Sequence, residues 1–87
     1  MASRHASARK RLRQTLRITA RNRPVRAATR NAVRRVREAI TAGDKKAAEK
    51  ALAIAIQRVD KSVGKGLWHR RAGSRTISRL SAQVSAL

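Results

Sequence analysis

The fold of this 87-residue chain is decided by residues 40–63, which read ITAGDKKAAEKALAIAIQRVDKSV. Gly43 followed by Asp44 is typical of the end of one helix and the N-cap of the next. Bulky apolar residues then recur at the period of one helix face, at Leu52, Ile56, Val59 and Val63. These residues predict a tight turn followed by a helix over about 45–63.

Two further segments flank this helix and have the same periodicity. Before it, apolar or small residues mark one face of a segment from Val25 to Ile40, namely Thr29, Ala32, Val33 and Val36. After it, Gly64 and Gly66 favour a turn, and an apolar stripe follows at Ile77, Leu80, Val84 and Leu87. We expect an all-α fold, in which residues 25–87 form a three-helix bundle with helices at about 25–42, 45–63 and 68–86.

Residues 1–24 are either a basic N-terminal extension or the first part of a long, basic helix one. Arginines recur at every fourth position here, and such like-charged pairs destabilise an isolated helix by a few tenths of a kcal/mol each. Pro24 costs about 3 kcal/mol or a kink inside a helix, although a first turn tolerates it. We favour a long helix with a kink or local break near 21–24, ordered only when bound.

The charge is strongly unbalanced, with 23 Lys and Arg against 4 Asp and Glu. Residues 1–37 contain thirteen bases and no acid, and residues 61–87 contain six bases and no acid. The four acids lie between Glu38 and Asp60, where four bases balance them. A solvated surface normally mixes both signs, so the two positive arms predict a polyanionic partner. Because the core of so small a chain is marginal, we expect the free protein to be partly unfolded.

The kind of basic residue indicates which kind of polyanion the chain binds. Seventeen of the 23 bases are Arg, whose planar guanidinium meets phosphate oxygens two at a time and also stacks on bases. Binders of single strands need aromatic platforms, and the single aromatic residue, Trp68, cannot supply one. The composition favours recognition of the shape and phosphate geometry of a folded RNA, or of bent or condensed DNA.

Four short motifs follow one another in a specific order from about residue 7 to residue 87. They are Ser7-Ala8-Arg9-Lys10-Arg11, Ile40-Thr-Ala-Gly-Asp-Lys-Lys-Ala-Ala48, Val59-Asp-Lys-Ser-Val-Gly-Lys-Gly-Leu-Trp-His-Arg70, and Arg75 with Ser78-Arg79-Leu80. In this order and spacing they resemble the family of bacterial small-subunit ribosomal protein twenty.

The resemblance implies a long N-terminal helix and two shorter helices in a protein without catalytic activity. It further implies binding to the five-prime domain of small-subunit ribosomal RNA early in assembly, and contact with the long helix near the three-prime end of that RNA. Other ribosomal proteins are expected nearby, in the cytoplasm. The chain departs from the family pattern at Arg71, at Gly73-Ser74 and at Pro24, which bears on local helix geometry.

Candidate RNA-binding residues lie in the N-terminal segment, in the helix after Pro24 and around the second turn. The glycines of that turn permit close approach to a phosphate backbone. The candidates are Arg9, Lys10, Arg11, Arg13, Arg17, Arg21, Arg30, Arg34, Lys65, His69, Arg70, Arg71, Arg75 and Arg79.

Structural or RNA-contacting roles are expected for His69 and Trp68 rather than catalytic ones. The chain has no Cys and only one other His, His5, so we expect a hydrogen bond to RNA or a helix-start role for His69 rather than catalysis or metal binding. Packing over the turn is favoured for Trp68 over stacking on a base. Since no acid pair or nucleophile–base pair is present, we expect no enzyme, cofactor, metal site or small-molecule substrate.

Two other function classes fit the charge less well. A DNA-condensing, histone-like nucleoid protein is the main alternative to an RNA-binding protein. A membrane-active cationic helix would need a wide apolar face in the N-terminal segment, which Leu12, Leu16 and Ile18 do not supply. No membrane association is therefore expected. A bacterial and an organellar origin both remain open.

Overall fold

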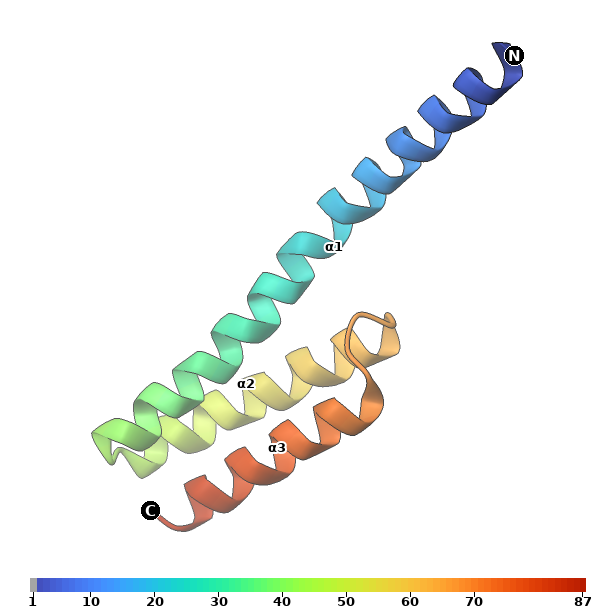
Figure 1. Ribbon diagram of the computed structural model, residues 1–87. Helices are drawn as coiled ribbons and strands as arrows, with labels where there is room; N and C mark the ends of the chain where they lie inside the picture. The colour runs from blue at the N-terminus through green and yellow to red at the C-terminus, as the bar shows by residue number, and fades with distance from the viewer. Residues whose placement is uncertain (1) are drawn as a thin grey trace.

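The computed structural model describes residues 2–87, including the side chains of residues 5–87, and these residues form three helices without a strand (Figure 1). Helix α1 spans Ala2–Ala42, α2 spans Lys45–Gly64 and α3 spans Arg70–Ser85. α2 runs back beside the C-terminal half of α1, and α3 runs back beside α2 (Figure 1). The expected all-α, three-helix fold with a long first helix is confirmed.

A long helix with a kink or local break was expected near residues 21–24. Helix α1 continues through Pro24 without interruption, so the break is wrong and the long helix is confirmed. Proline inside a helix leaves the carbonyl four residues earlier, that of Ala20, without its N–H partner. The side chains of residues 5–21 are all exposed, so this part of the helix is surrounded by solvent. Water can therefore take the place of the missing donor, and the long-helix alternative is the one the structure adopts.

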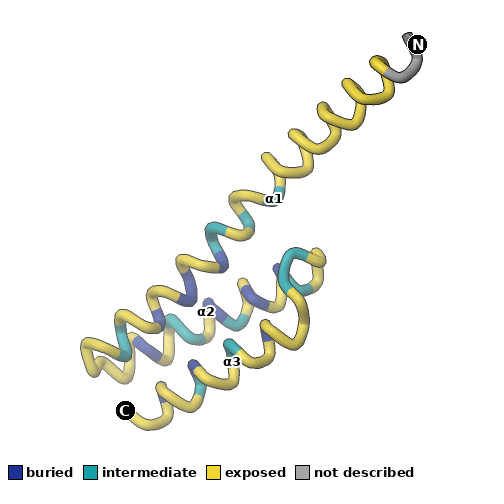
Figure 2. Tube along the Cα trace, viewed as in Figure 1, coloured by how far each residue is buried: buried dark blue, intermediate teal, exposed yellow. Residues whose placement is uncertain are grey.

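The molecule is a bundle with a projecting helix rather than a sphere. Its extents are 64 × 21 × 15 Å, and its radius of gyration is 18.0 Å. A compact chain of this length would have a radius of gyration of about 12 Å. The excess comes from the N-terminal part of α1, which runs past the ends of α2 and α3 and is exposed along its length (Figure 2).

Helices α1 and α2 end in the same backbone motif. After α1, the N–H of Gly43 donates to the Ile40 carbonyl at 3.0 Å and the N–H of Asp44 donates to the Ala39 carbonyl at 3.1 Å. Gly43 has a φ of 72°, which favours glycine, and the pair of bonds is a Schellman motif. Gly66, with a φ of 74°, closes α2 by the corresponding bonds to Val63 and from Leu67 to Ser62.

The first connection also starts the next helix. The side chain of Asp44 accepts a hydrogen bond from the N–H of Ala47 at 3.1 Å, which makes Asp44 the N-cap of α2. The stop at Gly43 and the cap at Asp44 are therefore confirmed. The observed helix differs from the expected one only by including Gly64.

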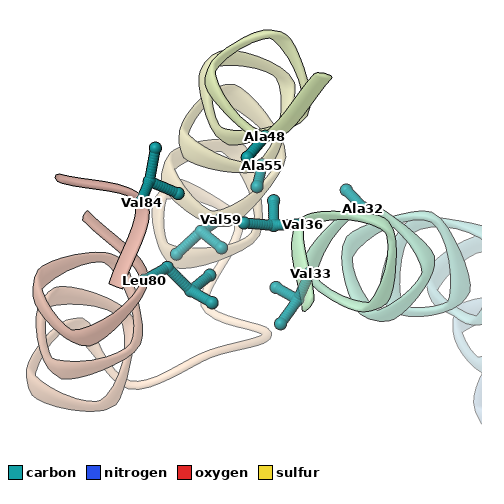
Figure 3. Close-up of a cluster of buried hydrophobic side chains, with 8 residues drawn as sticks. All are labelled: Ala32, Val33, Val36, Ala48, Ala55, Val59, Leu80 and Val84. Carbon is teal, nitrogen blue, oxygen red and sulfur yellow. The ribbon is translucent and has the colours of Figure 1, made fainter. Parts of the chain in front are cut away.

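The core is built mostly from small side chains contributed by all three helices (Figure 3). Its buried members are Ala32, Val33, Val36, Ala48, Ala55, Val59, Leu80 and Val84. Most of these follow the expected stripes, but Ala55 does not. Leu87 was expected in the stripe of the third helix and is 38% exposed, because α3 ends at Ser85. Alanine at the α1–α2 contact lets the two backbones approach closely.

Gly73 lies inside α3 and faces α2. A Cβ atom added to it would lie 2.9 Å from Val63 Cγ2 and 3.1 Å from Val59 Cγ1, which is closer than ordinary van der Waals contact. Glycine costs about 1 kcal/mol relative to alanine inside a helix. In this chain the missing side chain makes room for the two valines, so α3 can pack directly on α2.

Candidate nucleic-acid interface

All fourteen candidate residues have exposed side chains, but they do not form one patch. Six lie on the projecting part of α1, two lie on the bundle part of α1, and six lie from the second turn into α3. The three groups therefore lie on different parts of the molecule. A partner that contacts all of them has to approach from more than one side.

The projecting part of α1 is basic around most of its circumference. Successive residues of an α-helix are turned by about 100°, so Arg11 and Arg13 point to nearly opposite sides. Lys10, Arg13 and Arg17 lie on one side, where they line a shallow hollow together with Gln14. Between residues 5 and 24 the chain has seven bases and no acid, and every side chain from residue 5 to residue 21 is exposed.

Arg30 and Arg34 lie on the exposed side of α1 within the bundle. Arg34 Nε lies 3.6 Å from Glu38 Oε1, and both side chains are 68% exposed. It is the one ion pair among the residues whose side chains the structure describes. An exposed pair of this kind contributes little to stability. Nevertheless, Glu38 partly offsets the charge of Arg34, which makes Arg30 the stronger candidate of the two.

The second turn brings two distant candidates together. Lys65 is the C-cap residue of α2, and it lines a shallow hollow with Arg21 and Asn22 of α1. The antiparallel packing of α1 and α2 therefore places a base from the projecting helix beside a base from the turn. No acidic side chain lines this hollow.

His69 has a role in starting α3. Its backbone is extended, with φ −68° and ψ 136°, and its Nδ1 accepts a hydrogen bond from the N–H of Arg71 at 3.1 Å. α3 therefore begins at Arg70, two residues later than expected. Because Nδ1 accepts this bond, the neutral ring carries its proton on Nε2, which is left to donate elsewhere.

The remaining candidates follow the outer side of α3. Arg71, Arg75 and Arg79 are each four residues apart and form one row, whereas Arg70 is turned by about 100° from Arg71. The row lies away from the buried side of α3, which is marked by Gly73, Leu80 and Val84. Trp68 is half-buried and packs against the core.

One basic surface was missed in the sequence. Arg35 of α1 and Arg58 of α2 line a hollow between these two helices, although neither was a candidate. Arg58 had been counted only as a base that balances the central acids. Arg58, Lys61 and Lys65 repeat at spacings of three and four, which places them on one side of a helix. This row of basic residues was the sequence signal that could have predicted the basic surface of α2.

Metal-binding clusters and membrane-spanning helices are both absent from the described part of the chain. Among residues whose side chains are described, no three His, Cys, Asp or Glu come close enough together to hold a metal ion. Within the described residues, none of the helices contains a stretch that is both long and apolar enough to cross a membrane.

Known proteins resemble the chain over nearly its whole length. The family described as ribosomal protein S20 matches residues 3–85. The chain belongs to this family. A protein of Geotalea daltonii named small ribosomal subunit protein bS20 is 46% identical over 83 residues, which is 95% of each chain. Proteins of the same name from Geotalea uraniireducens and Maricaulis maris are 47% and 44% identical over 83 and 81 residues, covering at least 92% of each chain.

Membership of the S20 family confirms the resemblance inferred from the four motifs. The chain is accordingly a constituent of the small ribosomal subunit, a cytoplasmic particle in bacteria. The S20 family consists of structural ribosomal proteins, so the expectation that this chain is not an enzyme also holds. None of these matches assigns a role to an individual residue.

Proposed function

We propose that this S20-family protein binds and stabilises folded small-subunit ribosomal RNA, within its five-prime domain, during assembly of the subunit. The observation that carries the proposal is the projecting part of α1. It has seven bases and no acid between residues 5 and 24, and every side chain from residue 5 to residue 21 is exposed (Figure 2). A helix of this kind obtains counter-charge only from outside the protein, and ribosomal RNA supplies it at high density.

The distribution of bases supports a folded RNA over a straight duplex. Arg11 and Arg13 point to nearly opposite sides of α1, and the Arg71–Arg75–Arg79 row lies on the outer side of α3. A straight duplex meets one side of such a molecule. A folded RNA has several backbones that converge, so it can surround a projecting helix.

The fourteen candidate residues are proposed as the contacts that form this interface. All are exposed, and thirteen of them carry a fixed positive charge. If six to ten of these charges meet phosphates, affinity falls by about three to five decades between 50 and 200 mM salt. Arg34 is the weakest member of the set because Glu38 lies beside it.

The test compares three nucleic acids by filter binding at about 0.2 M salt, where non-specific phosphate binding is weak. They are a transcript of the five-prime domain, a transcript of another small-subunit domain of equal length, and random-sequence duplex DNA with the same number of phosphates. We expect the five-prime transcript to bind at least about tenfold more tightly than either control. Equal affinity for the DNA would instead indicate a DNA-condensing protein.

A further inference from the structure

A hollow of about 370 Å³ lies between α1 and α2 and receives no residue from α3. α1 contributes Ala28, Asn31, Ala32 and Arg35, and α2 contributes Ala51, Ile54 and Arg58. Figure 3 shows Ala32 on the side of α1 next to α2, whereas Val33 lies nearer to Leu80 of α3. The hollow is therefore separate from the outer row of arginines on α3. Its volume is within the range of small-ligand sites, about 300–1,000 Å³.

The floor of this hollow is apolar and its edges are cationic. The floor consists of alanines and Ile54, which is 51% exposed although it is one of the largest apolar side chains in the bundle. Arg35 and Arg58 lie on the two helices that form the edges, and both are exposed. No acidic residue lines the hollow, and the one ion pair of the described side chains lies elsewhere.

The hollow continues along the α1–α2 contact toward the projecting helix. A second depression shares Ala28 and Arg58 with the first and adds Pro24 and Lys61. Beyond it, Arg21 and Lys65 flank the third hollow. Together the three hollows make an α1–α2 groove. Its cationic lining residues are Arg21, Arg35, Arg58, Lys61 and Lys65, and its apolar base lies in the first two hollows. In this groove the apolar base is exposed to solvent, and no acidic residue among its lining residues balances the guanidinium groups.

An unpaired nucleotide can both cover the apolar base and supply negative charge to the guanidinium groups. Its base has a flat apolar face for the floor and a polar edge, which the amide of Asn31 can bond because it both donates and accepts. The phosphates on either side of the nucleotide can accept hydrogen bonds from Arg35 and Arg58, which line the same hollow. A free phosphate would leave the floor exposed, and an apolar side chain would leave the arginines without counter-charge. A paired base offers no free face.

We propose that the α1–α2 groove binds a single unpaired nucleotide of RNA. The base lies against Ile54 and the alanines, Asn31 bonds its edge, and Arg35 and Arg58 bind the adjacent phosphates. The inference rests on the proposed function, because it names a feature that the bound ribosomal RNA presents to this groove.

The test uses the full chain and an RNA duplex of about 20 base pairs, either fully paired or with one bulged nucleotide. We expect the bulged duplex to bind about tenfold more tightly at about 0.2 M salt. Ala28→Leu fills the floor and should abolish this preference. Ala53→Leu is the matched control, since Ala53 is exposed on α2 outside the hollow. Equal binding of both duplexes by the unmodified protein would overturn the inference.

Two further measurements keep the inference falsifiable if Ala28→Leu impairs folding. The double variant Arg35→Gln/Arg58→Gln changes only exposed side chains, and it should reduce the preference for the bulge. A photoreactive 4-thiouridine placed at the bulge should crosslink to residues 28–35 or 51–58. Crosslinks confined to residues 65–79 would assign the nucleotide to the second turn and α3, and the inference would fail.

The two proposals can fail separately. Loss of the bulge preference together with retained preference for the five-prime transcript removes the groove but leaves the ribosomal function standing. The reverse result, in which the bulge is preferred but the five-prime transcript is bound no better than DNA, removes the proposed function and leaves an RNA-binding groove.

Discussion

The hydroxyl oxygens of Thr29 and Ser62 lie 2.5 Å apart between α1 and α2, and neither residue has any exposed surface. Thr29 Oγ1 also lies 2.9 Å from the Val25 carbonyl and 3.3 Å from the Arg58 carbonyl. Thr29 is the buried residue of α1 nearest to the projecting part of that helix. This polar contact therefore fixes α1 to α2 at the end of the core from which the unsupported helix extends.

Thr29→Val should lower the free energy of unfolding by about 1–3 kcal/mol, because it keeps the shape of the side chain but leaves the buried Ser62 hydroxyl without its partner. Urea unfolding followed by circular dichroism measures the change. Thr41→Val is the matched control, since Thr41 bonds only the Arg37 carbonyl of its own helix and is exposed. A loss of equal size in both variants would mean that the Thr29–Ser62 contact contributes nothing specific.

Gly73→Ala should destabilise the bundle by about 1 kcal/mol, although alanine is the better helix former. The substitution gains about 1 kcal/mol of helix propensity, but forcing a Cβ against Val63 and Val59 costs roughly 1–3 kcal/mol. Adding Val63→Ala to Gly73→Ala should recover part of the loss, which a double-mutant cycle reveals. Ser74→Ala, at the exposed neighbouring position, serves as the control. A stabilised Gly73→Ala variant would contradict close packing of α3 on α2.

Free protein at low salt should contain less helix than the structure, with the deficit in the projecting part of α1. That part is exposed from residue 5 to residue 21, and its arginine row at residues 9, 13, 17 and 21 repels itself by a few tenths of a kcal/mol per pair. Circular dichroism measures the deficit, and hydrogen exchange should locate it between residues 5 and 21. Adding the five-prime transcript should restore protection there. Full helicity without RNA would refute the expectation.

Arg75→Ala/Arg79→Ala should weaken RNA binding by a few kcal/mol and flatten the salt dependence of log K by up to about two units. Both residues belong to the exposed row on α3, so folding should be unaffected. Lys45→Ala/Lys46→Ala removes the same charge from the start of α2 and should change the slope much less. The two slopes are measured over the same salt range. If they are equal, the α3 row has no specific role.

His69→Ala should destabilise the bundle by about 1 kcal/mol, whereas His69→Asn should leave it unchanged, because asparagine can also accept the cap bond from the N–H of Arg71. Thermal unfolding compares the two variants. Equal stability of both would mean that the cap is unimportant. Weaker RNA binding by His69→Asn at unchanged stability would show that the imidazole also contacts RNA.

The helix boundaries could be predicted from the sequence because local residues determine them. Gly43 and Asp44 specify a stop and a cap through their own backbone and side chain, so the helix expected at about 45–63 is found at Lys45–Gly64. The expected break near Pro24 was wrong for a different reason. The cost of an interior proline depends on whether solvent reaches the freed carbonyl, which follows from the exposure of α1 and not from the residue itself.

Contacts between helices could not be predicted in the same way. From the sequence, Gly73 was only a departure from the family pattern that bears on local helix geometry, and its role in packing becomes visible only when Val59 and Val63 are placed opposite it. Arg35 and Arg58 are far apart in the sequence, and they line one groove only because of the register in which α1 packs against α2. That register is set by small residues such as Ala55, which a search for bulky apolar stripes does not emphasise.

The thinness of the bundle has an electrostatic consequence. Two of its dimensions are only 21 and 15 Å, and the screening length in physiological salt is about 8 Å. The backbone is thus only about two to three screening lengths thick, so little low-dielectric interior separates the cationic side chains of opposite surfaces. Anionic strands held on both sides would repel one another if nothing stood between, and the intervening protein acts as a sheet of counterions that allows them to stay close.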